Sequence, residues 1–286
     1  MELTNIKTIE KLFEKYGFSF KKSLGQNFLI NPSVCPRMAA ASGADKDCGV
    51  LEIGPGIGVL TKELSAVAGK VVSVELDSRL IPLLLESLAD CDNVKIINSD
   101  ILKTDVSSLI KQEFGERPVK VCANLPYYIT SPVIMGLLEQ KLPIDSITVM
   151  VQKEAAQRIC ASPGTRECGA VSLAVSYYCE PKREFSVKRG SFMPAPNVDS
   201  EVITLKLRKT PPVNLSDEKM FFKVVRSAFS MRRKTLVNCL SKDFGLSKET
   251  LTALLESVSL KPTARAEELS LEKFAEISEM IAKKEY

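Results

Sequence analysis

Short runs of β-branched and other apolar residues alternate with helical patterns through the first two thirds of this 286-residue chain. A strand that is apolar along its whole length and is followed by a helix is typical of a parallel sheet covered on both faces. Five such runs begin roughly twenty to thirty residues apart, at residues 50–54, 71–76, 94–100, 119–125 and 146–152. Two later runs, at residues 170–180 and 200–208, predict two further strands. The chain is therefore expected to form an α/β fold around a seven-stranded, mostly parallel sheet.

The alternation of strands and helices stops at residues 209–212, which read Lys-Thr-Pro-Pro. Consecutive prolines disfavour the interior of both helices and strands, so this segment is a predicted linker. The sequence beyond it has helical spacing. We therefore expect an α/β domain over residues 1–210, with an N-terminal extension over 1–30, and a small helical domain over 211–286. Residues 8–18 of the extension predict a short amphipathic helix.

The composition excludes several kinds of site. Histidine is absent, which excludes Ser–His and Cys–His catalytic triads and His-ligated zinc. None of the eight cysteines forms a CxxC pair, so we expect reduced thiols and no metal site. The longest apolar run, residues 80–85, is too short to cross a bilayer, and the first residues lack the apolar core of a signal peptide. The expectation is a cytoplasmic protein without a membrane segment.

A glycine-rich loop, residues 52–58 (EIGPGIG), follows the first predicted strand. Glycines such as Gly54 and Gly56 let the backbone turn sharply and approach a ligand closely. The spacing is GxGxG and not the GxGxxG of nucleotide-binding dehydrogenases, and such a loop alone can be only a tight turn. No Lys or Arg occurs between residues 51 and 61 to clamp a pyrophosphate. The loop therefore favours a nucleoside ligand without phosphates.

Two carboxylates lie at the ends of the next two predicted strands. Glu75 ends the second strand, where a carboxylate can accept hydrogen bonds from both ribose hydroxyls of a nucleoside. Asp100 ends the third strand, where it can accept from an adenine amino group. Either acid alone is more often an exposed strand end or a helix cap. Together with the glycine loop they predict an adenosine-containing cofactor, and S-adenosylmethionine fits best.

The fourth strand ends in Asn124-Leu125-Pro126-Tyr127. An adenine amino nitrogen is a poor nucleophile because its lone pair is delocalised into the ring. The Asn124 side-chain oxygen and the Leu125 carbonyl can accept its two hydrogens and aim the lone pair at a methyl donor. Pro126 stiffens the turn, and Tyr127 can stack on a base that has left its helix. In isolation the segment could equally be an Asn-led turn with a core tyrosine, but after a nucleoside-binding sheet methyl transfer is the better interpretation.

The Asn-Leu-Pro-Tyr segment is a form of the (N/D)-P-P-(Y/F) motif of methyltransferases that act on exocyclic amino groups of bases. Four other segments match the same family: residues 25–29 (GQNFL), 152–154 (QKE), 192–200 (FMPAPNVDS) and 232–234 (RRK). Through these motifs the chain resembles the bacterial small-subunit ribosomal RNA adenine dimethyltransferases of the KsgA type. The resemblance covers roughly residues 20–275.

This resemblance implies a Rossmann-like, class I methyltransferase core that uses S-adenosylmethionine. It implies N6-dimethylation of two adjacent adenosines near the 3′ end of small-subunit rRNA, during ribosome biogenesis. The partner would be the small ribosomal subunit, and we expect a monomer that needs no metal. The implied cofactor-binding residues are Asn27, Leu29, Gly54, Gly56, Glu75, Asp100 and Asn124. The implied catalytic residues are Asn124, Leu125, Pro126, Tyr127 and Phe192, the last as a second stacking face for the target base.

A cluster of basic residues follows the predicted linker. Residues 219–242 contain seven Lys or Arg and no acid. If one helix runs over residues 219–234, most of these cations fall on one face. A break at residues 230–231 would spoil this single face but keep the cluster. A charged helix face is usually only solvated, but charge of a single sign over this length favours contact with a phosphate backbone. The expected RNA contacts are Lys219, Lys223, Arg226, Arg232, Arg233 and Lys234.

Three other functions are compatible with parts of this sequence. The first is a large-subunit rRNA adenine dimethyltransferase of the group that confers macrolide resistance, which the basic tail and residues 192–200 disfavour. The second is a ribosome-assembly factor whose methylation is secondary or lost; the intact segment 124–127 argues against lost catalysis but not against a dual role. The third is a nicotinamide-dependent oxidoreductase, which the GxGxG spacing and the missing phosphate clamp disfavour.

Overall fold

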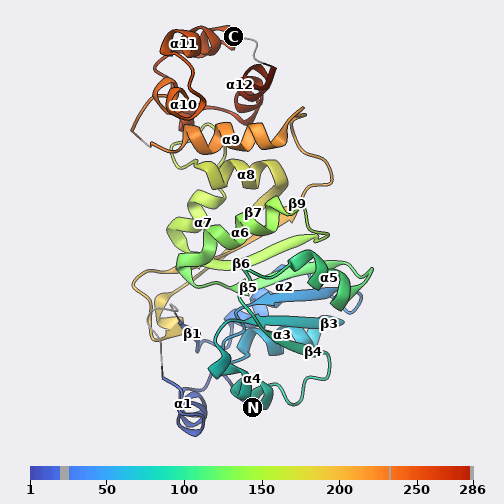
Figure 1. Ribbon diagram of the computed structural model, residues 1–286. Coiled ribbons are helices and arrows are strands. Elements are labelled where there is room, and N and C mark those ends of the chain that lie inside the picture. Colours follow the sequence, from blue (N-terminus) through green and yellow to red (C-terminus); the bar gives the residue numbers. More distant parts are fainter. Residues whose placement is uncertain (20–25, 232, 284–286) are drawn as a thin grey trace. The chain divides into compact units, whose positions relative to one another are not determined.

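A computed structural model describes residues 1–19, 26–231 and 233–283 of the chain (Figure 1). The chain forms two compact units, one made of Met1–Ala156 with Lys182–Leu207, the other of Gln157–Pro181 with Arg208–Tyr286. The longer segment of the second unit begins at Arg208, close to the expected boundary at residue 210. It also contains residues 157–181, which the sequence analysis assigned to the α/β domain.

Seven strands form one sheet in the order β4-β3-β2-β5-β6-β9-β7. Neighbouring strands are parallel from β4 through to β6, and β9 is antiparallel to β6. The strands are β2 (Gly49–Ile53), β3 (Lys70–Glu75), β4 (Val94–Asn98), β5 (Val119–Asn124), β6 (Ser146–Gln152), β7 (Cys179–Val187) and β9 (Ser200–Leu207). The five strands predicted between residues 50 and 152 and the one predicted at 200–208 are confirmed. A second, two-stranded antiparallel sheet joins β1 (Phe28–Leu29) to β8 (Phe192–Met193).

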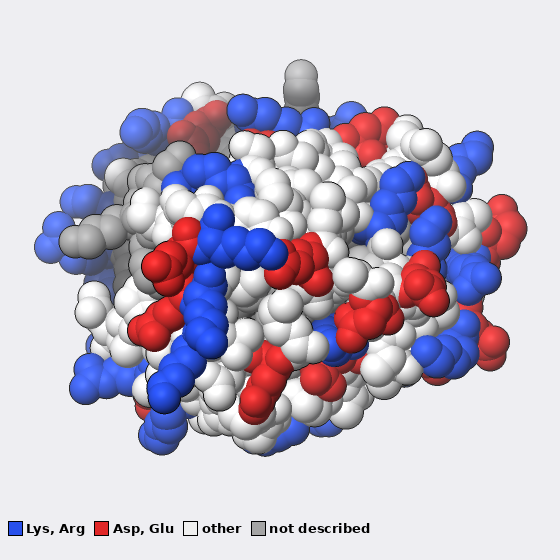
Figure 2. All heavy atoms as spheres, turned by 90° about the horizontal axis from the view of Figure 1, so that it is seen from below, with Lys and Arg blue, Asp and Glu red and all other residues white. Residues whose placement is uncertain are grey.

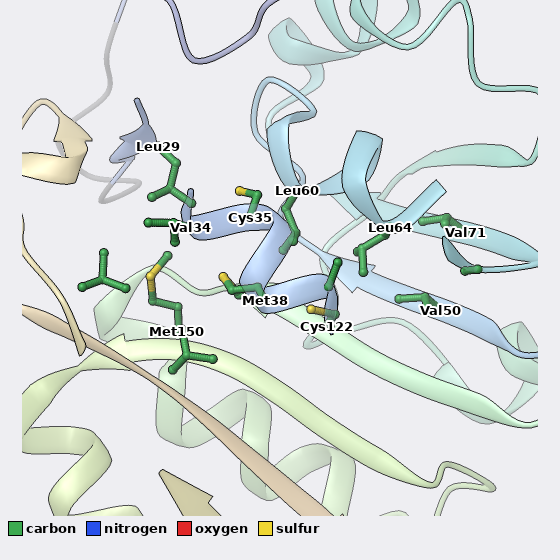
Figure 3. Packing of buried hydrophobic residues seen from close by; sticks show 14 of the residues in the cluster. Leu29, Val34, Cys35, Met38, Val50, Leu60, Leu64, Val71, Cys122 and Met150 are labelled. Atoms are coloured by element: carbon green, nitrogen blue, oxygen red, sulfur yellow. The ribbon is translucent and has the colours of Figure 1, made fainter. Parts of the chain in front are cut away.

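The helices α2 and α3 pack on each other and on strands of the large sheet. Met38 of α2 and Leu60 and Leu64 of α3 lie in one buried cluster with Val50 of β2 and Cys122 of β5 (Figure 3). The helices that precede residue 160 are α1 (Ile6–Lys15), α2 (Val34–Ser42), α3 (Val59–Val67), α4 (Ile81–Ser87), α5 (Val106–Phe114), α6 (Thr130–Glu139) and α7 (Lys153–Ile159). Short 3₁₀ turns lie at Ser78–Leu80, Tyr127–Ile129 and Arg189–Ser191.

The amphipathic helix predicted near the amino terminus is α1. Asn5 caps it by accepting a hydrogen bond from the Lys7 amide at 3.0 Å. Ile9, Leu12 and Phe13 are buried at helical spacing, in a cluster that also holds the apolar residues of α4. This packing fixes the N-terminal helix on the first unit.

The second unit is helical. Its helices are α8 (Ala170–Tyr178), α9 (Glu218–Ala228), α10 (Leu236–Phe244), α11 (Lys248–Ser257) and α12 (Leu271–Lys283), with a 3₁₀ turn at Ala266–Glu268. Tyr177 and Tyr178 of α8 pack on Phe221 and Phe222 of α9, and both tyrosine hydroxyls donate to Glu218. This aromatic cluster is why residues 157–181 belong with the C-terminal helices.

The prediction of a strand over residues 170–180 was wrong for most of its length, because 170–178 form helix α8 and the strand begins only at Cys179. Most of α8 is buried, and a run buried on nearly all sides shows neither the strand period nor the helix period. The strand that follows is rich in charged residues, which is common for a strand at the edge of a sheet and hides it from an apolar pattern.

Among the described residues, no helix is both long and apolar enough to cross a membrane. Within the same part of the chain, no group of three or more Cys, Asp and Glu side chains is placed to hold a metal ion.

Candidate active site

A cavity of about 240 Å³ opens at the carboxyl ends of the central strands. Its walls come from the glycine loop after β2, the ends of β3 and β5, the turn after β4, and the segment around β1 and β8. In open α/β sheets this edge is where ligands bind. The predicted cofactor and catalytic residues all line this one cavity: Asn27, Leu29, Gly54, Gly56, Glu75, Asp100, Asn124, Leu125, Pro126, Tyr127 and Phe192.

The glycine loop presents bare backbone to the cavity. Gly54, Gly56 and Gly58 have φ angles of +70°, +61° and +90°, which side-chain-bearing residues rarely adopt. A Cβ atom added at Gly54 would meet no other atom within 4 Å, so its Cα faces open space. A Cβ at Gly56 would lie 3.2 Å from the ring of Phe28. The loop therefore leaves room for a ligand beside Gly54, with Phe28 packed against its far end.

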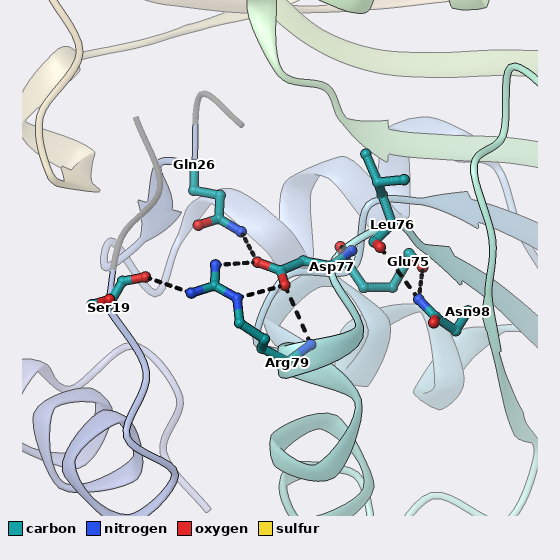
Figure 4. A network of polar contacts seen from close by, with 7 residues as sticks. All are labelled: Ser19, Gln26, Glu75, Leu76, Asp77, Arg79 and Asn98. Carbon is teal, nitrogen blue, oxygen red and sulfur yellow. Dashed lines mark hydrogen bonds and ion pairs between the residues drawn. The ribbon is translucent and has the colours of Figure 1, made fainter. Parts of the chain in front are cut away.

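The Glu75 carboxylate is held rigidly at the end of β3. Its two oxygens accept hydrogen bonds from the backbone amides of Asp77, at 2.8 Å, and Gly56, at 3.2 Å. The Asn98 amide donates to the carbonyls of Glu75 and Leu76 at 2.8 and 3.3 Å and so fixes the strand end (Figure 4). Burial raises the pKa of Glu75 above its usual 4.5. The carboxylate thus joins the glycine loop to β3 and can accept further hydrogen bonds from the cavity.

Asp100 and two leucines complete the same wall. One Asp100 oxygen accepts from the Leu102 amide at 3.0 Å, and the other lies 3.6 Å from the ammonium of Lys103, whose side chain is 83% exposed. Leu76 and Leu102 line the cavity although they are 51% and 49% exposed. A flat apolar ring between them would remove both side chains from water. The sequence motifs do not point to these leucines; the available signal is an apolar residue shortly after each strand-end acid.

Asn124 is the last residue of β5 and projects into the cavity. Its side-chain amide makes no hydrogen bond with any other residue that the structure describes, although the residue is partly buried. Leu125 is fully buried behind it, and Pro126 begins the 3₁₀ turn that carries Tyr127. A half-buried amide without a protein partner is costly unless a ligand or water satisfies it. The side-chain oxygen of Asn124 is therefore free to accept a hydrogen bond from a substrate amine.

Two aromatic residues line the cavity near Asn124. The Tyr127 hydroxyl hydrogen-bonds the hydroxyl of Ser200, the buried first residue of β9, at 2.8 Å. Phe192 is buried in β8 opposite Leu29 of β1. Asp199, next to Ser200, accepts from the Arg189 amide at 3.0 Å and so holds the turn before β8. Two consecutive residues, Asp199 and Ser200, thus support the segments that carry both aromatic rings.

These motifs occur together in known proteins. The sequence profile described as ribosomal RNA adenine dimethylase matches residues 17–283 of the chain. The chain belongs to the ribosomal RNA adenine dimethylase family. It is therefore an S-adenosylmethionine-dependent rRNA methyltransferase, as its motifs predict.

Individual members of the rRNA adenine dimethylase family are similar over nearly the whole chain. A ribosomal RNA small subunit methyltransferase A from Geobacillus thermodenitrificans (strain NG80-2) is 48% identical over 273 residues, covering 94% of this chain and 93% of that protein. The protein of the same name from Bacillus cytotoxicus is 49% identical over 271 residues, covering 93% of each chain.

Two solved structures share the fold. A dimethyladenosine transferase from Plasmodium falciparum has a TM-score of 0.74 at 26% identity and covers 90% of this chain and 98% of its own. The 23S rRNA methyltransferase ErmE has a TM-score of 0.67 at 25% identity and covers 90% of this chain and all of its own. The predicted seven-stranded methyltransferase fold with a helical C-terminal part is confirmed.

The residues of the cavity fit the cofactor of this dimethylase. Glu75 and Asp100 offer acceptors at two neighbouring strand ends, and the leucines beside them offer faces for an adenine ring. Gly54 leaves open space where a side chain would fill it. No Lys or Arg lines the cavity among the residues that the structure describes, so nothing there would pair with a pyrophosphate. This set suits a nucleoside that carries a positive sulfonium and not a dinucleotide.

The basic cluster differs from its prediction. Helix α9 ends at Ala228, so Lys219, Lys223 and Arg226 lie on it, whereas Arg233 and Lys234 lie in the turn before α10. Arg232 lies outside the described residues. These five described residues are all exposed, and the Lys223 ammonium lies 4.7 Å from the centre of the Phe244 ring. One helix over 219–234 does not form. The helix is broken close to residues 230–231, the alternative that the sequence left open, because the chain turns after Phe229 to bury the apolar residues of α10.

A buried carboxylate to which the sequence assigned no role lies in β2, two residues before the first glycine of the loop. Glu52 of β2 is 1% exposed. One of its oxygens accepts from the hydroxyls of Thr61 and Ser73 at 2.7 and 2.6 Å, and the other has no partner among the described residues. Burial, aided by the nearby charge of Glu75, raises the pKa of Glu52 to about 7. Glu52 therefore keeps a proton under conditions in which an exposed glutamate has lost it.

Glu52→Gln should make the dimethylase more stable than wild type at pH 8 but not at pH 5. In the unfolded chain Glu52 ionises near its usual pKa of 4.5, and in the folded protein near 7. The wild type therefore loses stability as the pH rises from about 4.5 to about 7, by about 3 kcal/mol in all. Glutamine keeps the acceptor for Thr61 and Ser73 and carries no charge. Denaturant unfolding of both proteins from pH 5 to 8 measures the difference, and parallel curves would contradict it.

Proposed function

We propose that this dimethylase transfers methyl groups from S-adenosylmethionine to the N6 amino groups of two adjacent adenosines near the 3′ end of small-subunit rRNA. It would dimethylate both adenosines in the cytoplasm, during ribosome biogenesis. The observation that carries the proposal is the unpartnered amide of Asn124, which lies in the same cavity as Glu75 and Asp100. An acceptor for an amine in the same cavity as two acceptors for an adenosine cofactor supports this proposal.

The chain's own residues orient the substrate amine. The Asn124 side-chain oxygen and the Leu125 carbonyl accept its two hydrogens, which turns the nitrogen lone pair toward the cofactor. Tyr127 and Phe192 offer aromatic faces to a base that has been turned out of its stack. When bound, S-adenosylmethionine supplies the methyl group, and the proton displaced from the amine leaves to water. Positioning and fixed dipoles supply most of the rate, so no histidine base is needed.

The relatives support the small subunit as substrate. The proteins that are 48% and 49% identical are named small subunit methyltransferases, whereas the 23S rRNA methyltransferase ErmE is 25% identical. A test is to incubate the protein with labelled S-adenosylmethionine and purified small or large ribosomal subunits, with Asn124→Ala as the inactive control. We expect label on adenosines of the small-subunit rRNA. Label in the large subunit alone would assign the enzyme to the macrolide-resistance group, and tight binding without label would favour an assembly factor.

We also propose that the exposed cations of α9 bind the rRNA backbone. Across the face in Figure 2, Lys and Arg are mixed with Asp and Glu, whereas residues 219–242 carry no acid at all. A contribution to affinity from phosphate contacts must weaken with salt. The arrangement on α9 therefore predicts a salt-dependent contact with rRNA.

Lys219→Glu with Arg226→Glu should weaken binding to small subunits and flatten its salt dependence. For every phosphate that the variant no longer neutralises, the slope of log affinity against log salt should fall by about 0.7 to 0.9. Filter binding across a salt series measures both quantities. Lys248→Glu with Lys261→Glu makes the same change in net charge on exposed residues of α11 and the loop after it. Equal behaviour of the two double variants would show that the cations of α9 act only through net charge.

A further inference from the structure

Asp77 is a buried carboxylate just outside the cofactor cavity. Its side chain is 4% exposed and does not line the cavity. It accepts from Arg79 through Nε at 2.8 Å, Nη2 at 2.6 Å and the backbone amide at 3.2 Å. It also accepts from the Gln26 side-chain amide at 3.0 Å (Figure 4). These charge-assisted bonds join residues 51 positions apart in the sequence and hold the pKa of Asp77 below its usual value.

The contacts of Asp77 and Arg79 tie the N-terminal region to the end of β3. Arg79 Nη1 donates to the Ser19 carbonyl at 3.3 Å, and its guanidinium lies 4.9 Å from the centre of the Phe18 ring. Phe18 in turn packs on Phe28, with ring centres 6.1 Å apart. The same side chains thus fix residues 18–19, which precede the cofactor wall formed by 26–29, and Gln26, the first residue of that wall. The backbone amide of Asp77 meanwhile donates to Glu75.

Segment 26–29 is a narrow strip of chain that needs support from its neighbours. Phe28 and Leu29 pair with β8 over two residues, and the ring of Phe28 packs among apolar residues of α1 and α4. A pair of such short strands has little stability by itself. If the segment were not held, cofactor binding would have to order it, and the apparent affinity would fall with the fraction of molecules in the competent arrangement. We infer that Asp77 is a positioning residue that holds segment 26–29 against the cavity and thereby sets the affinity for S-adenosylmethionine without contacting it.

The test is calorimetry of S-adenosylmethionine binding to the full chain, without RNA, so it does not depend on the rRNA substrate. Asp77→Asn should weaken binding by about tenfold or more. Hydrogen exchange should become faster in residues 26–30. Gln26→Met, which removes only one of the contacts, should have a smaller effect in the same direction. If both variants fold and bind with wild-type affinity, the inference is wrong.

Glu113→Gln is the matched control. Glu113 has a side chain that is 6% exposed, and it pairs with Lys70 at 3.0 Å and Lys95 at 2.6 Å. These lysines belong to β3 and β4 but lie at their amino ends, away from the cavity. The variant should lower the free energy of unfolding while leaving cofactor affinity unchanged. An equal loss of affinity in Glu113→Gln would mean that Asp77 acts only through overall stability.

A double variant separates positioning from charge. In Asp77→Asn, Arg79 keeps a positive charge near a cavity that binds a cationic cofactor, and this charge alone could weaken binding. Asp77→Ala with Arg79→Met removes both charges and also the ties to Gln26 and Ser19. Affinity that stays low, with fast exchange in residues 26–30, supports positioning. Affinity restored to the wild-type value would overturn it.

Discussion

Asn124→Ala should abolish most methyl transfer by the dimethylase, with a loss of about a hundredfold or more in kcat. The side chain ends β5 inside the cavity and has no protein partner in the described chain, so its removal disturbs no internal hydrogen bond. The variant lacks the side chain that we propose as the acceptor for the adenine amine. Initial rates on small ribosomal subunits at saturating S-adenosylmethionine measure the effect. The melting temperature and rRNA binding should stay near wild type, and cofactor affinity should fall only modestly.

Asn124→Asp is the informative comparison. A carboxylate oxygen can still accept from the amine, so this variant should retain more activity than Asn124→Ala. If activity falls in the order wild type, Asn124→Asp, Asn124→Ala, the role of the side chain is to accept a hydrogen bond. Near-normal turnover by Asn124→Ala would show that the amine is held elsewhere in the cavity.

Glu75→Ala should weaken S-adenosylmethionine binding by about 3 kcal/mol, or more than a hundredfold. The change removes the carboxylate that we propose as the acceptor for the ribose hydroxyls. It also leaves the amides of Gly56 and Asp77 without their partner, so the glycine loop loses its tie to β3. Calorimetry measures the affinity, and thermal unfolding reports any loss of stability from the loop. Unchanged affinity in a folded Glu75→Ala would exclude this role.

The protonation of Glu75 gives a second signature. Burial raises the pKa of Glu75, and the neutral acid is a poorer acceptor for two hydroxyls than the carboxylate. Cofactor affinity should therefore fall on acidification, at a pH above that at which an ordinary glutamate takes up its proton. Glu75→Gln should bind more weakly than wild type at neutral pH and lose this acid dependence. An affinity that falls equally in both proteins would assign the titration to another group.

Several features of the fold and cavity follow from short segments of sequence. The strands β2 to β6 are nearly continuous apolar runs. The glycine loop follows β2, and a polar residue ends or closely follows each of β3, β4 and β5. Because parallel strands bring their carboxyl ends to one edge, Gly54, Glu75, Asp100 and Asn124 had to lie near one another once the sheet was predicted. Their roles remain predictions until the variants above are measured.

Other features depend on contacts between distant residues, which leave no local pattern. Tyr127 meets Ser200 across 73 positions, and Asp77 meets Gln26 across 51. The raised pKa of Glu52 depends on its burial beneath α3, which the spacing of the loop does not reveal. The sequence does not show whether polar side chains such as these face water. Only the folded structure shows that they do not.

The sequence by itself determined where the strands β2 to β6 lie along the chain, the glycine loop and the strand-end acceptors, because each depends on local periodicity or on the geometry of parallel strands. Tertiary structure alone decided that residues 170–178 are a helix, since a segment buried on nearly all sides carries no period. It also decided where α9 ends, because burial of the apolar residues of α10 outweighs the helical spacing of the cations. Long-range burial and pairing, and not propensity, settle such cases, because the energy of packing exceeds the small preferences of single residues.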